Sequence, residues 1–187
     1  MPGPLVIDTC SLMNFFRYYY FDLHDGSKTY TLLRDFLIKK INADEIIILD
    51  KVANELKWSE FTNFKKEIRA KIKNTGHLVA NIKELSEKYY IKENETNIFK
   101  DNKNAIEEAR RNYENDCADL YLVAHCMELK SQGHTPILIT EETTRKDGKL
   151  HQKIPTMCKT ERIECKNIPH VLFEIYQREL IFTIEVK

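Results

Sequence analysis

Acidic side chains stand directly after two of the most apolar stretches in the sequence. Asp8 follows the run at residues 4–7, and Glu141 and Glu142 follow the run at residues 136–140. Short apolar runs of this kind are typical of buried parallel strands. Ligands of open parallel sheets bind beyond the carboxyl ends of the strands. We therefore expect these acids to gather at one edge of a sheet.

Two helices are expected to bring further carboxylates to the same edge. Glu55 lies one turn into a helix that follows a second apolar run at residues 45–49. Asp116 and Asp119 are three residues apart at the start of a helix predicted over residues 115–130, so they would share one face. That helix must run antiparallel to the strand after it, and its beginning then lies at the carboxyl edge too.

Four or five carboxylates in one small volume repel each other strongly unless a cation neutralises them. Oxygen ligands without a cysteine or histidine motif favour Mg²⁺ or Mn²⁺ over zinc. One or two such ions activate water and steady phosphate oxygens, so the chemistry predicted is phosphodiester hydrolysis. The candidate metal ligands are Asp8, Glu55, Asp116, Asp119, Glu141 and Glu142.

Each of these acids also has an ordinary structural explanation. Asp8 suits the cap of the helix that follows it, and Glu55 suits a solvated helix face. Asp116 suits a helix start, where the macrodipole favours negative charge. The joint placement at one edge is what points to a site.

The order of elements predicts an α/β fold, a three-layer sandwich with a mainly parallel central sheet. The length of 187 residues suits a single domain, 1–187, with a helical insertion over about 60–115. Strands are predicted at residues 4–7, 45–49, 136–140, 162–165 and 181–186, helices at 8–20, 27–42, 115–130, 154–160 and 168–180, and a loop at 93–104.

The composition limits which binding partners and which cellular compartment the sequence predicts. Lysine plus arginine equals aspartate plus glutamate at 29 each, so nucleic-acid binding would need a local basic patch. The five cysteines form no C-x-x-C pair, which argues against a disulfide framework or zinc site and favours a reducing cytosol. Without a signal peptide or an apolar run of about 18 residues, a cytoplasmic protein with no membrane partner is expected.

Four short motifs resemble those of PIN-domain nucleases, in the same order and over nearly the whole chain. Residues 6–12 resemble the opening D-T/S-x-x-L, and residues 52–56 resemble the V-x-x-E-L helix. Residues 119–124 resemble the D-x-x-I/L-x-A helix, and residues 137–142 resemble the strand ending in T-x-D. Each motif alone is weak, but four in order are fairly specific.

The resemblance implies cleavage of single-stranded RNA with Mg²⁺ or Mn²⁺. The catalytic residues implied are Asp8, Glu55, Asp119 and a fourth acid, which is Glu here instead of Asp; Glu141 or Glu142 could fill this place, and the T-x-D register favours Glu142. VapC-like toxins of this family pair with an antitoxin, so the candidate partners are RNA, a cognate antitoxin and a second copy of the chain. The long insertion, and a stretch at 149–165 that resembles a less characterised bacterial branch, depart from compact toxins.

Basic side chains near the fourth acid are the candidates for binding the RNA backbone. Phosphate contacts of this kind add affinity without reading sequence. A second basic cluster at 65–73 suits a solvated helix face equally well. The candidate substrate-binding residues are Ser11, Arg145, Lys146, Lys149 and Lys153.

Three other functions compete with the nuclease. A haloacid-dehalogenase-type phosphatase needs an aspartate two residues after Asp8, where Cys10 stands. A receiver domain with Asp50 as phosphoacceptor would leave Glu55 and Asp119 without a role. The alternative that remains open is a PIN-like scaffold that binds RNA or a partner protein without cleaving it.

Overall fold

The computed structural model describes residues 3–16, 28–56, 61–143 and 150–177. Four parallel strands form its sheet, in the order β2-β1-β3-β4: β1 (Leu5–Ile7), β2 (Ile46–Ile47), β3 (Ile137–Ile139) and β4 (Glu164–Lys166). The two central strands consist of fully buried branched residues, as parallel strands covered on both faces require. The predicted α/β fold with a parallel sheet is confirmed. The strand predicted at 181–186 lies outside the described residues.

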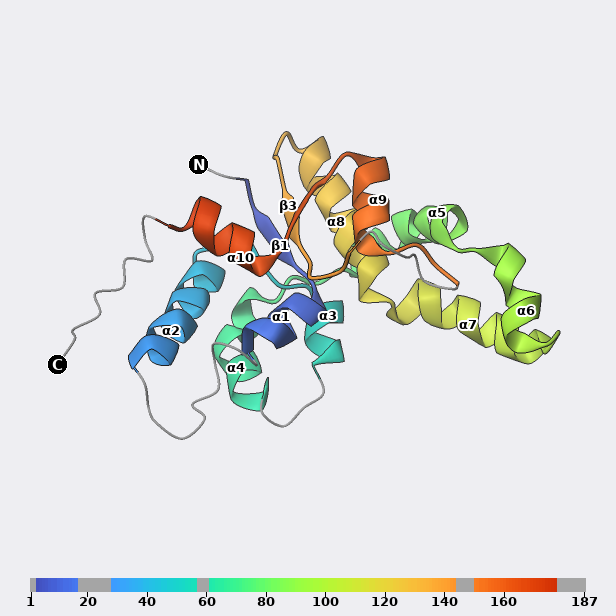
Figure 1. Cartoon of the computed structure of the whole chain (residues 1–187), viewed down its shortest axis with the longest axis horizontal. Helices are drawn as coiled ribbons and strands as arrows, with labels where there is room; N and C mark the ends of the chain where they lie inside the picture. The colour runs from blue at the N-terminus through green and yellow to red at the C-terminus, as the bar shows by residue number, and fades with distance from the viewer. Residues whose placement is uncertain (1–2, 17–27, 57–60, 144–149, 178–187) are drawn as a thin grey trace.

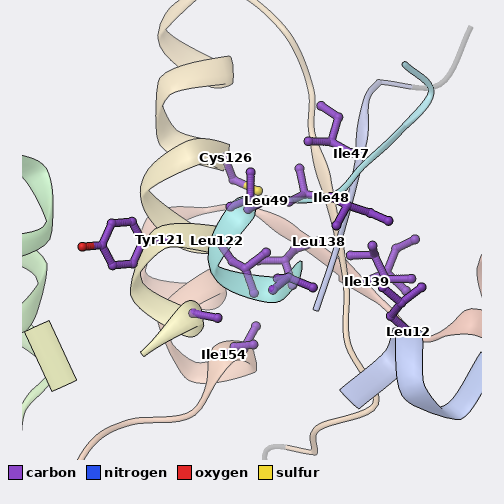
Figure 2. Close-up of a cluster of buried hydrophobic side chains, with 14 of the residues drawn as sticks. Leu12, Ile47, Ile48, Leu49, Tyr121, Leu122, Cys126, Leu138, Ile139 and Ile154 are labelled. Carbon is purple, nitrogen blue, oxygen red and sulfur yellow. The ribbon is translucent and has the colours of Figure 1, made fainter. Parts of the chain in front are cut away.

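Helices cover both faces of the sheet (Figure 1). On one face, Ile7, Ile46 and Ile139 line a small internal cavity together with side chains of α1 (Thr9–Phe15), α2 (Lys28–Asn42) and the segment after α10 (Ile168–His170). On the other face, α8 (Ala118–Ser131) packs against β1 and β3, and Leu122 and Leu138 lie in one cluster (Figure 2). The arrangement is a three-layer sandwich.

The helix α8 is buried along most of its length because further helices pack on its outer side. These are α3 (Asp50–Glu55), α5 (Val79–Tyr89) and α9 (Ile154–Glu161). Residues 120–126 of α8 are all buried. A helix that is apolar all round is typical of such a central position. No helix in the described part of the chain is long and apolar enough to span a membrane.

The predicted insertion at about 60–115 divides into two parts (Figure 1). The helix α4 (Phe61–Ile68) packs beside α2, and Phe64 contacts Phe16 edge-on with ring centroids 4.5 Å apart. After two 3-10 turns at Arg69–Lys71 and Gly76–Leu78, α5, α6 (Glu95–Phe99) and α7 (Lys103–Asp116) form an arm at the other end of the molecule.

The loop predicted at 93–104 is wrong, since α6 and a 3-10 turn at Lys92–Asn94 lie there. A two-point ion pair holds this segment: Arg110 donates to both carboxylate oxygens of Glu95, at 2.7 and 2.6 Å. This pair joins α6 to α7 across 15 residues, and no local pattern of apolar residues signals it.

The last helix is also shorter than predicted. Residues 168–180 were expected to form one helix, whereas α10 ends at His170 and a π-helical turn follows at Val171–Ile175. The chain stops being helical at Tyr176, whose ring packs edge-on against Phe36 with centroids 5.0 Å apart.

Candidate functional site

Asp8 stands at the carboxyl end of β1 and caps α1. Its Oδ1 accepts a hydrogen bond from the backbone N of Ser11 at 2.5 Å, and its Oδ2 accepts one from the hydroxyl of Thr140 at 2.6 Å. Only 3% of the residue is exposed. Burial raises the pKa of the Asp8 carboxyl, and the charge of Glu142 adds to the rise, while hydrogen bonds from Ser11 and Thr140 oppose it. Asp8 is both a helix cap and a buried acid.

Glu55 ends α3 and reaches two other elements. Its Oε2 accepts a hydrogen bond from the hydroxyl of Thr9 at the start of α1. Its Oε1 accepts one from the backbone N of Ala118 at 3.3 Å, the first residue of α8. The residue that caps α8 locally, Cys117, gives no side-chain cap. Glu55 therefore supplies an acceptor to the amino end of α8, beside Asp119.

Asp119 lies in the first turn of α8 and is half-buried. Desolvation raises the pKa of its carboxyl from 3.8 to about 7, and the charges of Glu142, Glu55 and Asp8 contribute in that order. The charge of Lys153 opposes this rise. Asp119 therefore lies within electrostatic reach of three acids that come from three other segments of the chain, at the carboxyl edge of the sheet.

Asp116 does not share a face with Asp119, contrary to expectation. Asp116 is the last residue of α7, and α8 begins only at Ala118. Cys117 between them is extended, with φ −74° and ψ 107°, which breaks the predicted helix 115–130 in two. Asp116 is exposed, and it is not among the charges that raise the pKa of Asp119.

Glu141 and Glu142 point to different helices. Glu142 accepts a hydrogen bond from the backbone N of Ile154, at the start of α9, at 3.0 Å. Glu141 accepts one from the backbone N of Ile168, at the start of α10, at 2.9 Å. Of the two, Glu142 is the one whose charge is among the main causes of the raised pKa of Asp8 and Asp119. The structure thus brings Asp8, Glu55, Asp119 and Glu142 together and places Glu141 on the other side of the turn.

Burial and the charges of all four acids raise the pKa of the Cys10 thiol. Desolvation raises its pKa to about 11, and the negative charges of Asp8, Glu142, Asp119 and Glu55 add to this. As the side chains stand, no three Asp, Glu, His or Cys residues in the described ranges are disposed to ligate one ion. The donor atoms are carboxylate oxygens, which suit Mg²⁺ or Mn²⁺, but cation binding requires side chains to turn inward from their helix-capping partners.

The predicted substrate-binding residues divide between described and undescribed segments. Arg145, Lys146 and Lys149 lie outside the described residues. Lys153 directly precedes α9 and is close enough to Asp119 to lower the pKa of its carboxyl. Ser11 is fully buried in α1, so its hydroxyl does not face open solvent.

Two features of the site were missed by sequence reasoning. Thr9 and Thr140 each donate to one of the acids, and both stand beside an acid or a strand end in the sequence, a signal that could have identified them. The arm contributes too: the backbone N of Ile91 donates to Leu150 O at 2.7 Å, and that of Gln152 donates to Tyr89 O at 3.1 Å. These bonds fasten the segment that leads into Lys153, and they join parts of the chain too distant for local patterns to reveal.

The comparisons with known proteins give a family and no relative of known activity. A family model described as "Domain of unknown function (DUF4411)" matches residues 5–177, which is most of the chain. No curated protein and no solved structure matches this chain. The matched range includes all four acids at the sheet edge.

Proposed function

The chain belongs to the DUF4411 family, and we propose that it is a metal-dependent endoribonuclease that hydrolyses phosphodiester bonds of single-stranded RNA. The observation that carries this proposal is the gathering of Asp8, Glu55, Asp119 and Glu142 at one edge of the sheet, where burial and then the charges of the other three acids raise the pKa of Asp119 to about 7. A folded protein keeps such mutual repulsion at a cost, and acids with strongly shifted pKa values cluster at functional sites.

Oxygen chemistry supports the choice of cation. Asp8, Asp119 and Glu142 would hold Mg²⁺ or Mn²⁺, with Glu55 beside them. The cation, when bound, would activate water and neutralise charge on the phosphodiester group. Without thiolate or imidazole in the group of four acids, a zinc site has no support among these residues.

The chain's own residues would position the substrate. The charge of Lys153 lowers the pKa of the Asp119 carboxyl, so Lys153 lies close enough to the acids to contact a phosphate oxygen of a bound strand. Thr140 fixes Asp8 through its hydroxyl, and its hydroxyl oxygen accepts from the backbone N of Glu142 at 3.1 Å. This threonine therefore holds two of the four acids in place.

The test is a cleavage assay on single-stranded RNA, with Mg²⁺ or Mn²⁺ and with EDTA. Cleavage that needs the cation and disappears in EDTA is expected. RNA binding without cleavage under all of these conditions would instead make the protein a scaffold.

We propose further that the nuclease is the toxin of a toxin–antitoxin or defence system, with a cognate antitoxin as partner. This role rests on the resemblance to VapC-like proteins. Growth arrest on expression, relieved by the neighbouring gene product, tests this role.

A further inference from the structure

A cavity of about 480 Å³ opens beside the acidic site, within the size range of small-molecule binding sites. It runs along the edge strand β4, from Ile163 before the strand to His170 beyond its carboxyl end, and it reaches the carboxyl end of β3 at Thr140. The turn after β3 forms one wall, and α9 and α10 contribute others. The lining residues include Thr140, Glu142, Lys159, Ile163, Cys165 and His170.

The cavity and the acidic site share a wall. Thr140 lines the cavity while its hydroxyl donates to Asp8, and Glu142 lines it while belonging to the four acids. The Cys165 thiol in the cavity wall is also close enough to these acids to be affected by their charges. Its contact with Cys158 lowers its pKa, while burial and the charges of Asp8 and Glu142 oppose this effect. A ligand in the cavity would therefore lie next to the acids.

Cationic side chains surround the far side of the cavity. Lys159 is exposed near the end of α9. Lys166 also lines it, but its ammonium group is paired with Glu174 and, at 3.2 Å, with Glu164, so Lys159 and His170 are the candidates for contact with an anion. His170 Nδ1 lies 2.5 Å from Asn167 Oδ1. Lysine and histidine on an open rim are suited to a phosphate group.

The floor of the cavity is apolar. The buried side chain of Ile163 and the ring of Pro155 line it beside Cys165. A cavity for a bare anion needs no apolar floor, whereas a nucleotide presents a charged phosphate and a flat base of low polarity. The combination of a cationic rim and an apolar floor therefore suits a nucleotide unit better than phosphate alone.

From this geometry we infer that the cavity binds one nucleotide of the RNA strand, with its phosphate toward Lys159 and His170 and its bond to the next nucleotide toward Glu142. The inference rests on the proposed ribonuclease function. It assigns to the cavity the unit adjoining the cleaved bond, and it adds residues of α9 and α10 to the substrate site. Binding of this unit does not require the cation.

The first experiment measures the binding of AMP and UMP to the full chain in EDTA by titration calorimetry. Lys159→Ala should weaken binding roughly tenfold, the loss expected for one charge-assisted contact, and Lys159→Glu should weaken it further. Lys39→Ala, an exposed lysine on α2, should leave binding unchanged. Inorganic phosphate that binds as tightly as AMP would contradict a nucleotide site, as would unchanged AMP binding in both Lys159 variants.

Cleavage kinetics separate this inference from the proposed function. If both hold, Lys159→Ala raises KM for single-stranded RNA with a much smaller change in kcat, because it removes uniform binding. Cation-dependent cleavage with unchanged KM in both Lys159 variants would overturn the cavity and leave the nuclease. AMP binding that depends on Lys159, in a protein that cleaves no RNA, would leave the cavity and overturn the nuclease.

Discussion

Asp8 and Asp119 are unusual among the acids because the fold raises the pKa of each, by burial and by the other acids around them. Replacement by asparagine keeps the size and removes the charge. RNA cleavage should fall by orders of magnitude in Asp8→Asn and in Asp119→Asn, because cation binding needs that charge. Initial rates at saturating Mn²⁺ measure this. Full activity in both variants would end the nuclease proposal.

Glu141 and Glu142 provide a matched pair of variants, because each side chain accepts one backbone hydrogen bond at the start of a helix. Glutamine keeps an acceptor oxygen at both positions. Glu142→Gln should therefore lose cleavage as Asp8→Asn does, and Glu141→Gln should be nearly silent. The same cleavage assay compares them. Equal losses in both variants would show that helix capping, and not charge at the acidic site, is what matters there.

The raised pKa of Asp119 also predicts how stability varies with pH. The folded state binds the proton more tightly than the unfolded chain, so Asp119 lowers stability progressively as pH rises from its ordinary value, 3.8, to about 7. In EDTA, Asp119→Asn should be as stable as the parent protein at low pH and more stable near pH 7. Urea midpoints across this range test it. A parent protein that gains stability relative to the variant over the range would contradict the assignment.

At the scale of elements, α4 belongs to the core, although the sequence places it in the predicted insertion. Phe64 is fully buried against Phe16 of the α1 segment. Phe64→Ala should cost about 3–5 kcal/mol of unfolding free energy, as large-to-small changes at buried aromatics do. Chemical denaturation measures the loss, and Phe64→Leu should lose less. A cost below about 1 kcal/mol in Phe64→Ala would show that α4 packs loosely.

Elements with a strong local signal were predictable, and those set by distant contacts were not. The apolar runs before Asp8 and Glu141 identified β1 and β3, and with them two parts of the acidic site. The break at Cys117 was not visible, because residues 115–130 read as one continuous helix. An acceptor from α3, Glu55, meets the new helix start, and this contact spans 63 residues. For that reason Asp116 ends one helix and Asp119 begins the next, and only Asp119 belongs to the acidic site.

At the scale of the whole molecule, the four acids come from the ends of β1, α3 and β3 and from the start of α8, so they meet only in the folded chain. The arm α5–α7 does not carry any of them. It bonds instead to the segment before Lys153 and to Glu161 of α9, whose carboxylate accepts from Lys88 at 2.8 Å. The arm therefore supports one side of the site from outside the sheet.

Because the acids converge only on folding, a cation that they bind should stabilise the whole protein. At a concentration roughly 100 times the dissociation constant the gain is about 2.7 kcal/mol. For a chain of this length, that raises Tm by about 5–10 °C. Thermal melting with Mg²⁺ or Mn²⁺ measures it. The shift should vanish or shrink strongly in Asp119→Asn and persist in Glu141→Gln, whose side chain lies apart from the four acids. An equal shift in Asp119→Asn would locate the cation elsewhere, and the absence of a shift with both ions would count against a cation site at this edge of the sheet.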